Sequence, residues 1–140
     1  MSALLYEVKD GIAWIRFNKP EILNAFDADE CRHFVKTLKE AAEDKAVKAI
    51  ILSSVGPAFS SGDDLKAALE EYPQIQSGEI HPILDIVEDI TENLQEIPRI
   101  IRRAPKVVIA AVRGYAVGAG FEISIDSDLA KHWIVFCNFI

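Results

Sequence analysis

The amino-acid sequence predicts an α/β fold in which strands alternate with helices. Residues 4–9 and 12–17 alternate apolar and polar side chains around Asp10-Gly11, a dipeptide typical of tight β-hairpins. Residues 47–53 and 107–112 are short apolar runs rich in β-branched residues, as in buried strands. Segments with helical spacing separate these runs, so the chain is expected to cross over between parallel strands.

Three of these segments carry a clear helical pattern. The first covers about 28–43 and follows Asp27, which with the glutamate three residues later resembles a capping box. The second covers 83–103, with a kink or break expected near Pro98 because proline lacks a backbone N–H. The third begins near Gly120, after a glycine-rich turn. A further short helix is expected from about residue 63.

Composition and charge exclude several classes of protein. The 140 residues include 15 Lys and Arg against 22 Asp and Glu, a net charge of −7, which argues against a nucleic-acid-binding face. Cys31 and Cys137 lie too far apart in sequence for a CxxC metal site, and His33, His81 and His132 are scattered, so no metal is expected. No signal peptide and no membrane-spanning stretch are recognised, and a reduced, cytoplasmic location is expected.

Two loops follow the second pair of predicted strands and have the character of a ligand site. They cover residues 54–64 and 113–120, and ligands of α/β folds bind beyond the carboxyl ends of strands. Each loop contains glycine and leads into a helix, whose first N–H groups lack intrahelical acceptors. Two such N–H groups aimed at one point would form an oxyanion hole, although simple glycine turns would give the same spacing.

The residues of these loops resemble two signatures of the enoyl-CoA hydratase/isomerase (crotonase) family. The first is Phe59-Ser60-Ser61-Gly62-Asp63-Asp64-Leu65-Lys66, and the second runs from Ile109 to Glu122. Asn24-Ala25-Phe26 is similar to an early loop of the family, and all three motifs occur in the family's order. The resemblance implies a crotonase-like (ClpP/crotonase) spiral of ββα units that is truncated at its C-terminus. Residues 1–130 would form a partial acyl-CoA-binding domain, and residues 131–140 an atypical apolar tail.

The resemblance also implies a role for individual residues. The backbone N–H groups of Ser61 and Ala119 are the expected oxyanion donors, and Glu122 is the expected catalytic carboxylate. A solvated helix residue is the alternative for Glu122. The groove for coenzyme A would be lined by residues of the early loop and of the first signature: Ala25, Gly62, Asp63, Asp64, Leu65 and Lys66. The basic residues Arg99, Arg102, Arg103 and Lys106 are expected to form a solvated helix end, with a site that faces a CoA phosphate as the alternative.

The function implied is that of an acyl-CoA hydratase or isomerase, whose oxyanion hole stabilises the enolate of an enoyl-CoA thioester. Fatty acid β-oxidation, a trimer-based homo-oligomer and no cofactor beyond the coenzyme A of the substrate are expected with it. A second hypothesis is a non-catalytic remnant that keeps part of the CoA groove. This hypothesis remains open because the second catalytic carboxylate of hydratases and the helices that cover the acyl pocket lie beyond the matched motifs. A nucleotide-binding domain is the third and least supported hypothesis, since the glycines at 114, 118 and 120 do not have GxGxxG spacing.

Overall fold

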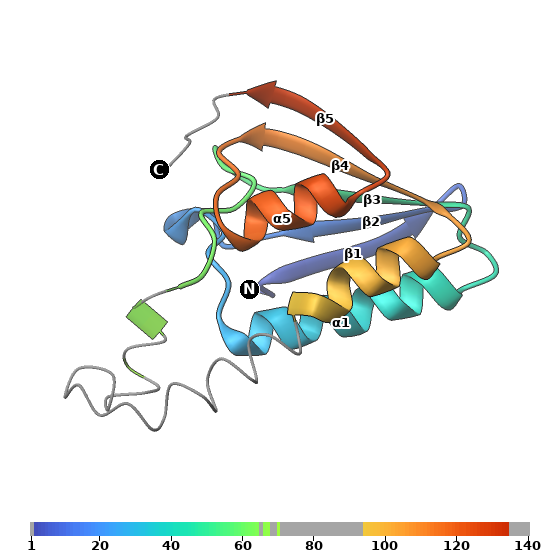
Figure 1. The fold of residues 1–140 in the computed structure, drawn as a ribbon, viewed down its shortest axis with the longest axis horizontal. Coiled ribbons are helices and arrows are strands. Elements are labelled where there is room, and N and C mark those ends of the chain that lie inside the picture. The colour runs from blue at the N-terminus through green and yellow to red at the C-terminus, as the bar shows by residue number, and fades with distance from the viewer. Residues whose placement is uncertain (1, 65, 68–69, 71–93, 135–140) are drawn as a thin grey trace.

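The computed structural model describes residues 2–64, 66–67, 70 and 94–134, the last four of these by their backbone alone. The strands form one five-stranded sheet. Figure 1 shows the helices gathered on one of its faces. The strands lie in the order in which they occur along the chain. β1 is antiparallel to β2, and each later strand is parallel to the one before it. Their bounds are β1 Leu4–Lys9, β2 Ile12–Phe17, β3 Ala49–Ser54, β4 Val107–Gly114 and β5 Leu129–Ile134.

The predicted β-hairpin is confirmed. Asp10 and Gly11 have φ angles of 53° and 79°, and Lys9 pairs with Ile12 across the turn. Positive φ at both turn residues is what a two-residue hairpin needs, because it matches the twist of the two strands. Asp and Gly tolerate this conformation better than bulkier residues, so the local sequence fixes the hairpin.

The helices also follow the prediction where the structure describes them. α1 covers Ala28–Glu43, and α5 covers Ala119–Asp126. Residues 94–103 are helical without a break at Pro98, whereas residues 83–93 of the predicted second helix lie outside the described residues. A short 3₁₀ helix, η1, covers Pro20–Ile22. Between residues 64 and 93, positions 66, 67 and 70 are the ones described as helical. None of the helices described is long and apolar enough to cross a bilayer.

The sheet continues past the boundary that the sequence predicts at residue 130. β5 covers Leu129–Ile134 and pairs in parallel with β4, with Gly114 opposite Ile134. The first residues of the predicted apolar tail are therefore part of the sheet. Residues 135–140 lie outside the described residues.

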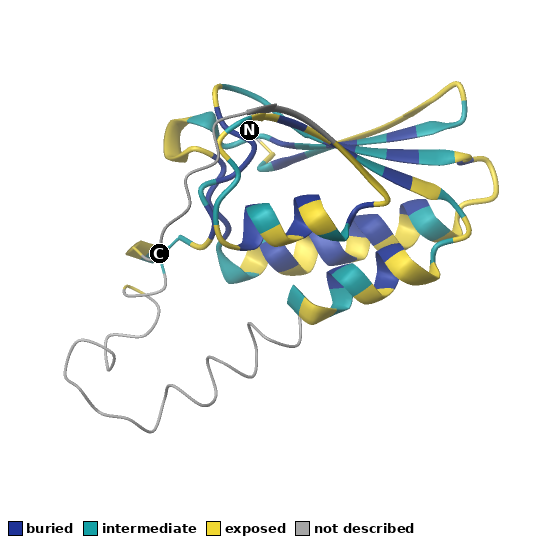
Figure 2. Ribbon diagram, turned by 45° about the horizontal axis from the view of Figure 1, so that its top comes forward, coloured by how far each residue is buried: buried dark blue, intermediate teal, exposed yellow. Residues whose placement is uncertain are grey.

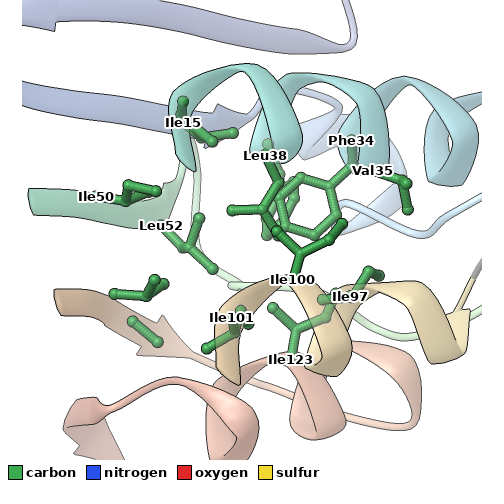
Figure 3. Close-up of a cluster of buried hydrophobic side chains, with 14 of the residues drawn as sticks. Ile15, Phe34, Val35, Leu38, Ile50, Leu52, Ile97, Ile100, Ile101 and Ile123 are labelled. Atoms are coloured by element: carbon green, nitrogen blue, oxygen red, sulfur yellow. The ribbon is translucent and has the colours of Figure 1, made fainter. Parts of the chain in front are cut away.

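A single apolar core lies between the helices and one face of the sheet. Alternate residues of β2, β3 and β4 point into it, as the dark bands on the strands in Figure 2 show. Figure 3 shows how these side chains meet those of α1, of residues 94–103 and of α5. The fully buried members include Ile15, Phe34, Leu38, Ile50, Leu52, Ile97 and Ile101. This core sets the three helices against the sheet and so places the loops between them.

A cluster of charges fixes the start of α1. The Asp27 carboxylate accepts the Glu30 N–H, and the Glu30 carboxylate accepts the Asp27 N–H, which completes the predicted capping box. The Lys19 Nζ lies 3.0 Å from the Asp27 carboxylate and 2.9 Å from that of Glu30. Burial opposes the charge on Asp27, but the hydrogen bond from Glu30 N–H and the Lys19 ammonium outweigh it and lower the pKa of Asp27. Burial raises the pKa of Glu30 despite the same ammonium.

This cluster leads to a first prediction. Asp27→Ala should lower the free energy of unfolding by about 1 kcal/mol at neutral pH, because it removes the helix cap. The Asp27 charge adds to the free energy of unfolding above its ordinary pKa of 3.8. This stabilisation is lost as the pH falls through the lowered pKa of the folded state. Urea titrations between neutral pH and about pH 3 should therefore show the loss shrinking on acidification.

Asp29→Ala is the matched control. Asp29 lies in the same helical turn, but its side chain is 90% exposed and pairs only with Arg32. Asp29→Ala should lower the free energy of unfolding by a few tenths of a kcal/mol at most. Equal losses for the two variants at neutral pH would contradict the role of the Asp27 cap.

Candidate functional site

Three loops meet at the carboxyl edge of the parallel strands. They follow β2, β3 and β4 and cover about residues 18–26, 55–64 and 115–118. They contain the three motifs that the sequence analysis singles out. The three loops are joined by backbone hydrogen bonds, and the Asn24 side chain adds bonds between the first two.

The second and third loops form a short parallel ladder. Ser60 bridges Ala116, the N–H groups of Phe59 and Ser60 donate to Tyr115 O at 2.8 and 3.1 Å, and Val117 N–H donates to Ser60 O at 3.0 Å. The ladder holds the first signature directly beside the second.

The first and second loops are joined in the same way. Phe26 bridges Asp63, with Phe26 N–H donating to Gly62 O and Asp64 N–H donating to Phe26 O, both at 2.8 Å. Ala25 therefore lies beside the first signature. Ala25 is buried and Gly62 is buried, while Asp63 and Lys66 are exposed.

The remaining residues of the predicted groove have local roles. The Asp64 carboxylate accepts the N–H groups of Lys66 and Ala67 at 3.1 and 3.0 Å, which orders the chain after the loop. The Lys66 ammonium lies 3.9 Å from Glu70. Burial of the carboxyl raises the pKa of Asp63, although the residue as a whole is exposed. Leu65 lies outside the described residues.

Glycines permit the close approach of the loops. A Cβ on Gly114 would overlap the carbonyl oxygen of Pro57, and one on Gly120 would lie 2.5 Å from the Ser60 Cβ. A Cβ on Gly62 would lie 3.0 Å from the Val117 carbonyl oxygen. The contacts at Gly114 and Gly120 are closer than real Cβ atoms approach, so these two positions leave no room for a side chain. At Gly62 the contact is tight, and its φ of 91° strains any residue with a side chain.

The two predicted oxyanion donors differ in their surroundings. Ser61 N–H donates to the Leu23 carbonyl at 3.0 Å, so this donor already has an acceptor. Ala119 is the first residue of α5 and is buried, and its N–H has no acceptor among the described residues. An unpaired N–H at a helix N-terminus is a favourable place for developing negative charge.

Glu122 lies one turn beyond Ala119 on α5. Both residues line a cavity of about 100 Å³ between α5 and the helix over residues 94–103. Glu122 is exposed, so its carboxylate is accessible from this cavity. The remaining lining residues are mostly apolar: Leu94, Gln95, Ile97, Pro98, Ile123 and Asp126.

Two of the basic residues form ion pairs, and a third donates to backbone carbonyls. Arg99 pairs with Glu96 at 3.1 Å, and Arg102 lies 3.6 Å from Asp126. Lys106 donates to the carbonyl groups of Ala41 and Asp44 at the end of α1. Capping of a helix end therefore describes Lys106 better than recognition of a phosphate. Across the described ranges, no group of three or more His, Cys, Asp or Glu side chains could hold a metal ion.

Asn24 is the residue of this site that the sequence analysis did not select. Its side chain is 2% exposed, donates to the carbonyls of Val55 and Ala58 at 3.0 and 2.8 Å, and accepts Lys19 N–H at 2.8 Å. The signal available in the sequence was an asparagine followed by two apolar residues in a turn, where positive φ favours asparagine.

The parallel sheet, the covering helices and the paired glycine loops define the crotonase fold. A probable enoyl-CoA hydratase from Mycobacterium smegmatis superposes with a TM-score of 0.77 at 31% identity, over 93% of this chain and 48% of that chain. Human enoyl-CoA hydratase domain-containing protein 3 gives a TM-score of 0.78 at 28% identity, over 92% of this chain and 47% of that chain.

Sequence comparison identifies the family. The enoyl-CoA hydratase/isomerase profile matches residues 7–131, and the chain belongs to this family. The 1,4-dihydroxy-2-naphthoyl-CoA synthase of Mycobacterium tuberculosis is 31% identical over 129 residues, which are 87% of this chain and 41% of that protein. The trans-2-decenoyl-[acyl-carrier-protein] isomerase of Streptococcus mutans is 27% identical over 125 residues, 89% of this chain and 45% of that protein. The chain thus spans less than half the length of these relatives.

The contact of Gly120 with Ser60 gives a second prediction. Gly120→Ala should lower the free energy of unfolding by about 1–3 kcal/mol, because the new methyl group overlaps the Ser60 side chain. In a Ser60→Gly background the same substitution should cost clearly less, since the overlapping atoms are gone. Chemical unfolding of the four proteins of this double-mutant cycle measures the difference, and strictly additive costs would contradict the contact.

Proposed function

We propose that the chain carries the oxyanion hole and one catalytic carboxylate of an acyl-CoA hydratase or isomerase. The observation that carries the proposal is the position of Ala119 and Glu122 at one cavity. Ala119, whose N–H has no acceptor within the part of the chain that the structure describes, and Glu122, one helical turn away, line the same small cavity. Membership of the enoyl-CoA hydratase/isomerase family supports an acyl-CoA thioester as the substrate.

The chemistry follows from the charge that develops on the thioester. When the carbonyl oxygen accepts two backbone N–H groups, it can carry the negative charge of an enolate. Removal of a proton from the α-carbon, or addition of water to the β-carbon of an enoyl group, then has a lower barrier. Glu122 would move the proton or orient the water, because its carboxylate lies beside the expected position of the thioester.

Ser61 would take part in this scheme by sharing its N–H between the Leu23 carbonyl and the thioester oxygen in a three-centre hydrogen bond. The Leu23 carbonyl is its acceptor in this structure. The first donor is thus satisfied before the ligand arrives, which avoids the cost of leaving a buried N–H unpaired.

A non-catalytic binding module is the second candidate, and one observation favours it. The Ser61 N–H already donates to the Leu23 carbonyl, so one of the two expected oxyanion donors is engaged within the protein. An oxyanion hole is strong only where water is excluded. A homo-oligomer, a cytoplasmic location and a role in β-oxidation belong to the proposal as properties of the family.

Calorimetry with coenzyme A and with a saturated acyl-CoA thioester tests ligand recognition in both candidates. The thioester should bind at least about tenfold more tightly than free coenzyme A, because only the thioester supplies a carbonyl to the donors. Binding of the thioester without turnover of an enoyl-CoA would favour the non-catalytic module. Equal affinity for both ligands would refute recognition of the thioester.

Glu122→Gln tests the catalytic role. Turnover of crotonyl-CoA should fall by about 10²-fold or more with little change in thioester affinity, because the amide cannot transfer a proton. Glu40→Gln is the control, since Glu40 lies on the exposed side of α1 away from the loops. Turnover of Glu122→Gln within about twofold of the parent would remove Glu122 from the mechanism.

A further inference from the structure

We propose that Asn24 is a positioning residue of the oxyanion hole, which fixes the direction of the Ser61 N–H through the Leu23 carbonyl and the loop after β3. The inference rests on the proposed function, because it assigns Asn24 a part in the same reaction. Asn24 would not touch the substrate. Its effect would pass through the backbone that presents the donor.

The side-chain amide of Asn24 is almost fully engaged. Its NH₂ group has two protons, and they go to the carbonyls of Val55 and Ala58, while its oxygen accepts the Lys19 N–H. Because the side chain is 2% exposed, water cannot replace these partners. No other residue type of similar size offers two donors and an acceptor in this geometry.

These bonds hold both sides of Ser61. Within the loop after β3, the Asn24 side chain binds the carbonyl of Ala58, three residues before Ser61. Across the loops, Asn24 follows Leu23, whose carbonyl is the acceptor of Ser61 N–H, and the Ser61 hydroxyl donates to Ile22 O at 3.4 Å. The Ser61 N–H therefore lies where the loop after β2 meets the loop after β3, and the buried side-chain amide of Asn24 joins these two loops.

The backbone at this point needs such a restraint. Leu23 and Asn24 both have φ of 55°, the left-handed region that L-amino acids other than Asn and Asp rarely adopt. Leu23 cannot stabilise this conformation with its own side chain. The bonds of Asn24 hold the pair of left-handed residues in place, and with them the direction of the Leu23 carbonyl.

A change in the direction of the donor should affect the transition state more than the ground state. The oxyanion carries full charge only as the enolate forms, so a misdirected N–H costs most at that stage. Loss of Asn24 should thus lower kcat and leave KM nearly unchanged. A residue that served stability alone would lower the fraction of folded protein and leave both constants of the folded molecules unaltered.

The experiment measures how strongly the bound thioester carbonyl is polarised. The probe is dimethylaminocinnamoyl-CoA, a chromophoric enoyl thioester whose absorption moves to longer wavelength when its carbonyl accepts hydrogen bonds. Spectra of the bound probe are compared for the parent chain, Asn24→Ala and Asn24→Asp, at protein concentrations that saturate the probe. Asn24→Asp keeps the volume and the acceptor of asparagine but loses both donors.

Thr37→Val is the matched control. Thr37 is buried in α1, where its hydroxyl donates to His33 O at 2.9 Å, far along the chain from the three loops. The substitution removes a buried side-chain hydrogen bond and preserves the shape of the residue. It should lower stability but leave the full wavelength shift of the probe.

We expect both Asn24 variants to lose at least half of the wavelength shift of the parent. With crotonyl-CoA, kcat should fall by about 10²-fold, as for a donor misplaced by about 1 Å, with KM within about threefold of the parent. A full shift and parent kcat in a folded Asn24 variant would overturn the inference. So would the failure of both variants to fold while Thr37→Val folds, because Asn24 would then be required for stability alone. A parent chain that does not shift the probe contradicts the proposed function itself, and the inference falls with it.

Discussion

Gly114 ends β4 at a point where the carbonyl oxygen of Pro57 occupies the space of a side chain. This backbone-to-backbone contact is the constraint on which the edge of the sheet depends. The chain after β3 can lie against the chain after β4 only because no Cβ separates them, and Gly120 repeats the contact on Ser60. The ladder between Ser60 and Ala116 follows from this approach. The ladder in turn places Ser61 and Ala119 at one edge, with the core beneath them.

The core has the complementary task of fixing the helices that frame the site. Ile97 and Ile101 pack with Ile123 beneath the sheet, so the helix over residues 94–103 and α5 keep a constant separation. The cavity beside Ala119 and Glu122 lies in the space between these helices. Side-chain packing and backbone pairing thus fix two different parts of the site. Side-chain packing sets the width of the cavity, and backbone pairing of the loops sets the direction of the N–H groups.

Local chemistry explains which parts of the structure the sequence predicts. Asp10-Gly11 selects its hairpin, and Asp27 begins α1, because each effect depends on residues only a few positions apart. The bonds of Asn24 span 31 and 34 residues to Val55 and Ala58, and no local pattern encodes them. The bond from Ser61 N–H to Leu23 O is equally non-local. The place of Leu129–Ile134 in the sheet also depends on pairing with β4, since an apolar run alone does not distinguish a strand from a tail.

The presentation of N–H groups by the main chain has a consequence for how such a site can diverge. The proposed donors Ser61 and Ala119 act through atoms that every residue except proline possesses, so their side chains can be exchanged without loss of the donor. The packing at Gly114 and Gly120 admits no such exchange, because any side chain collides with a neighbouring backbone or Cβ atom. More substitutions are therefore tolerated at the proposed donors than at the glycines that bring the donors together. A distant relative should be easier to recognise by its glycines than by its donors.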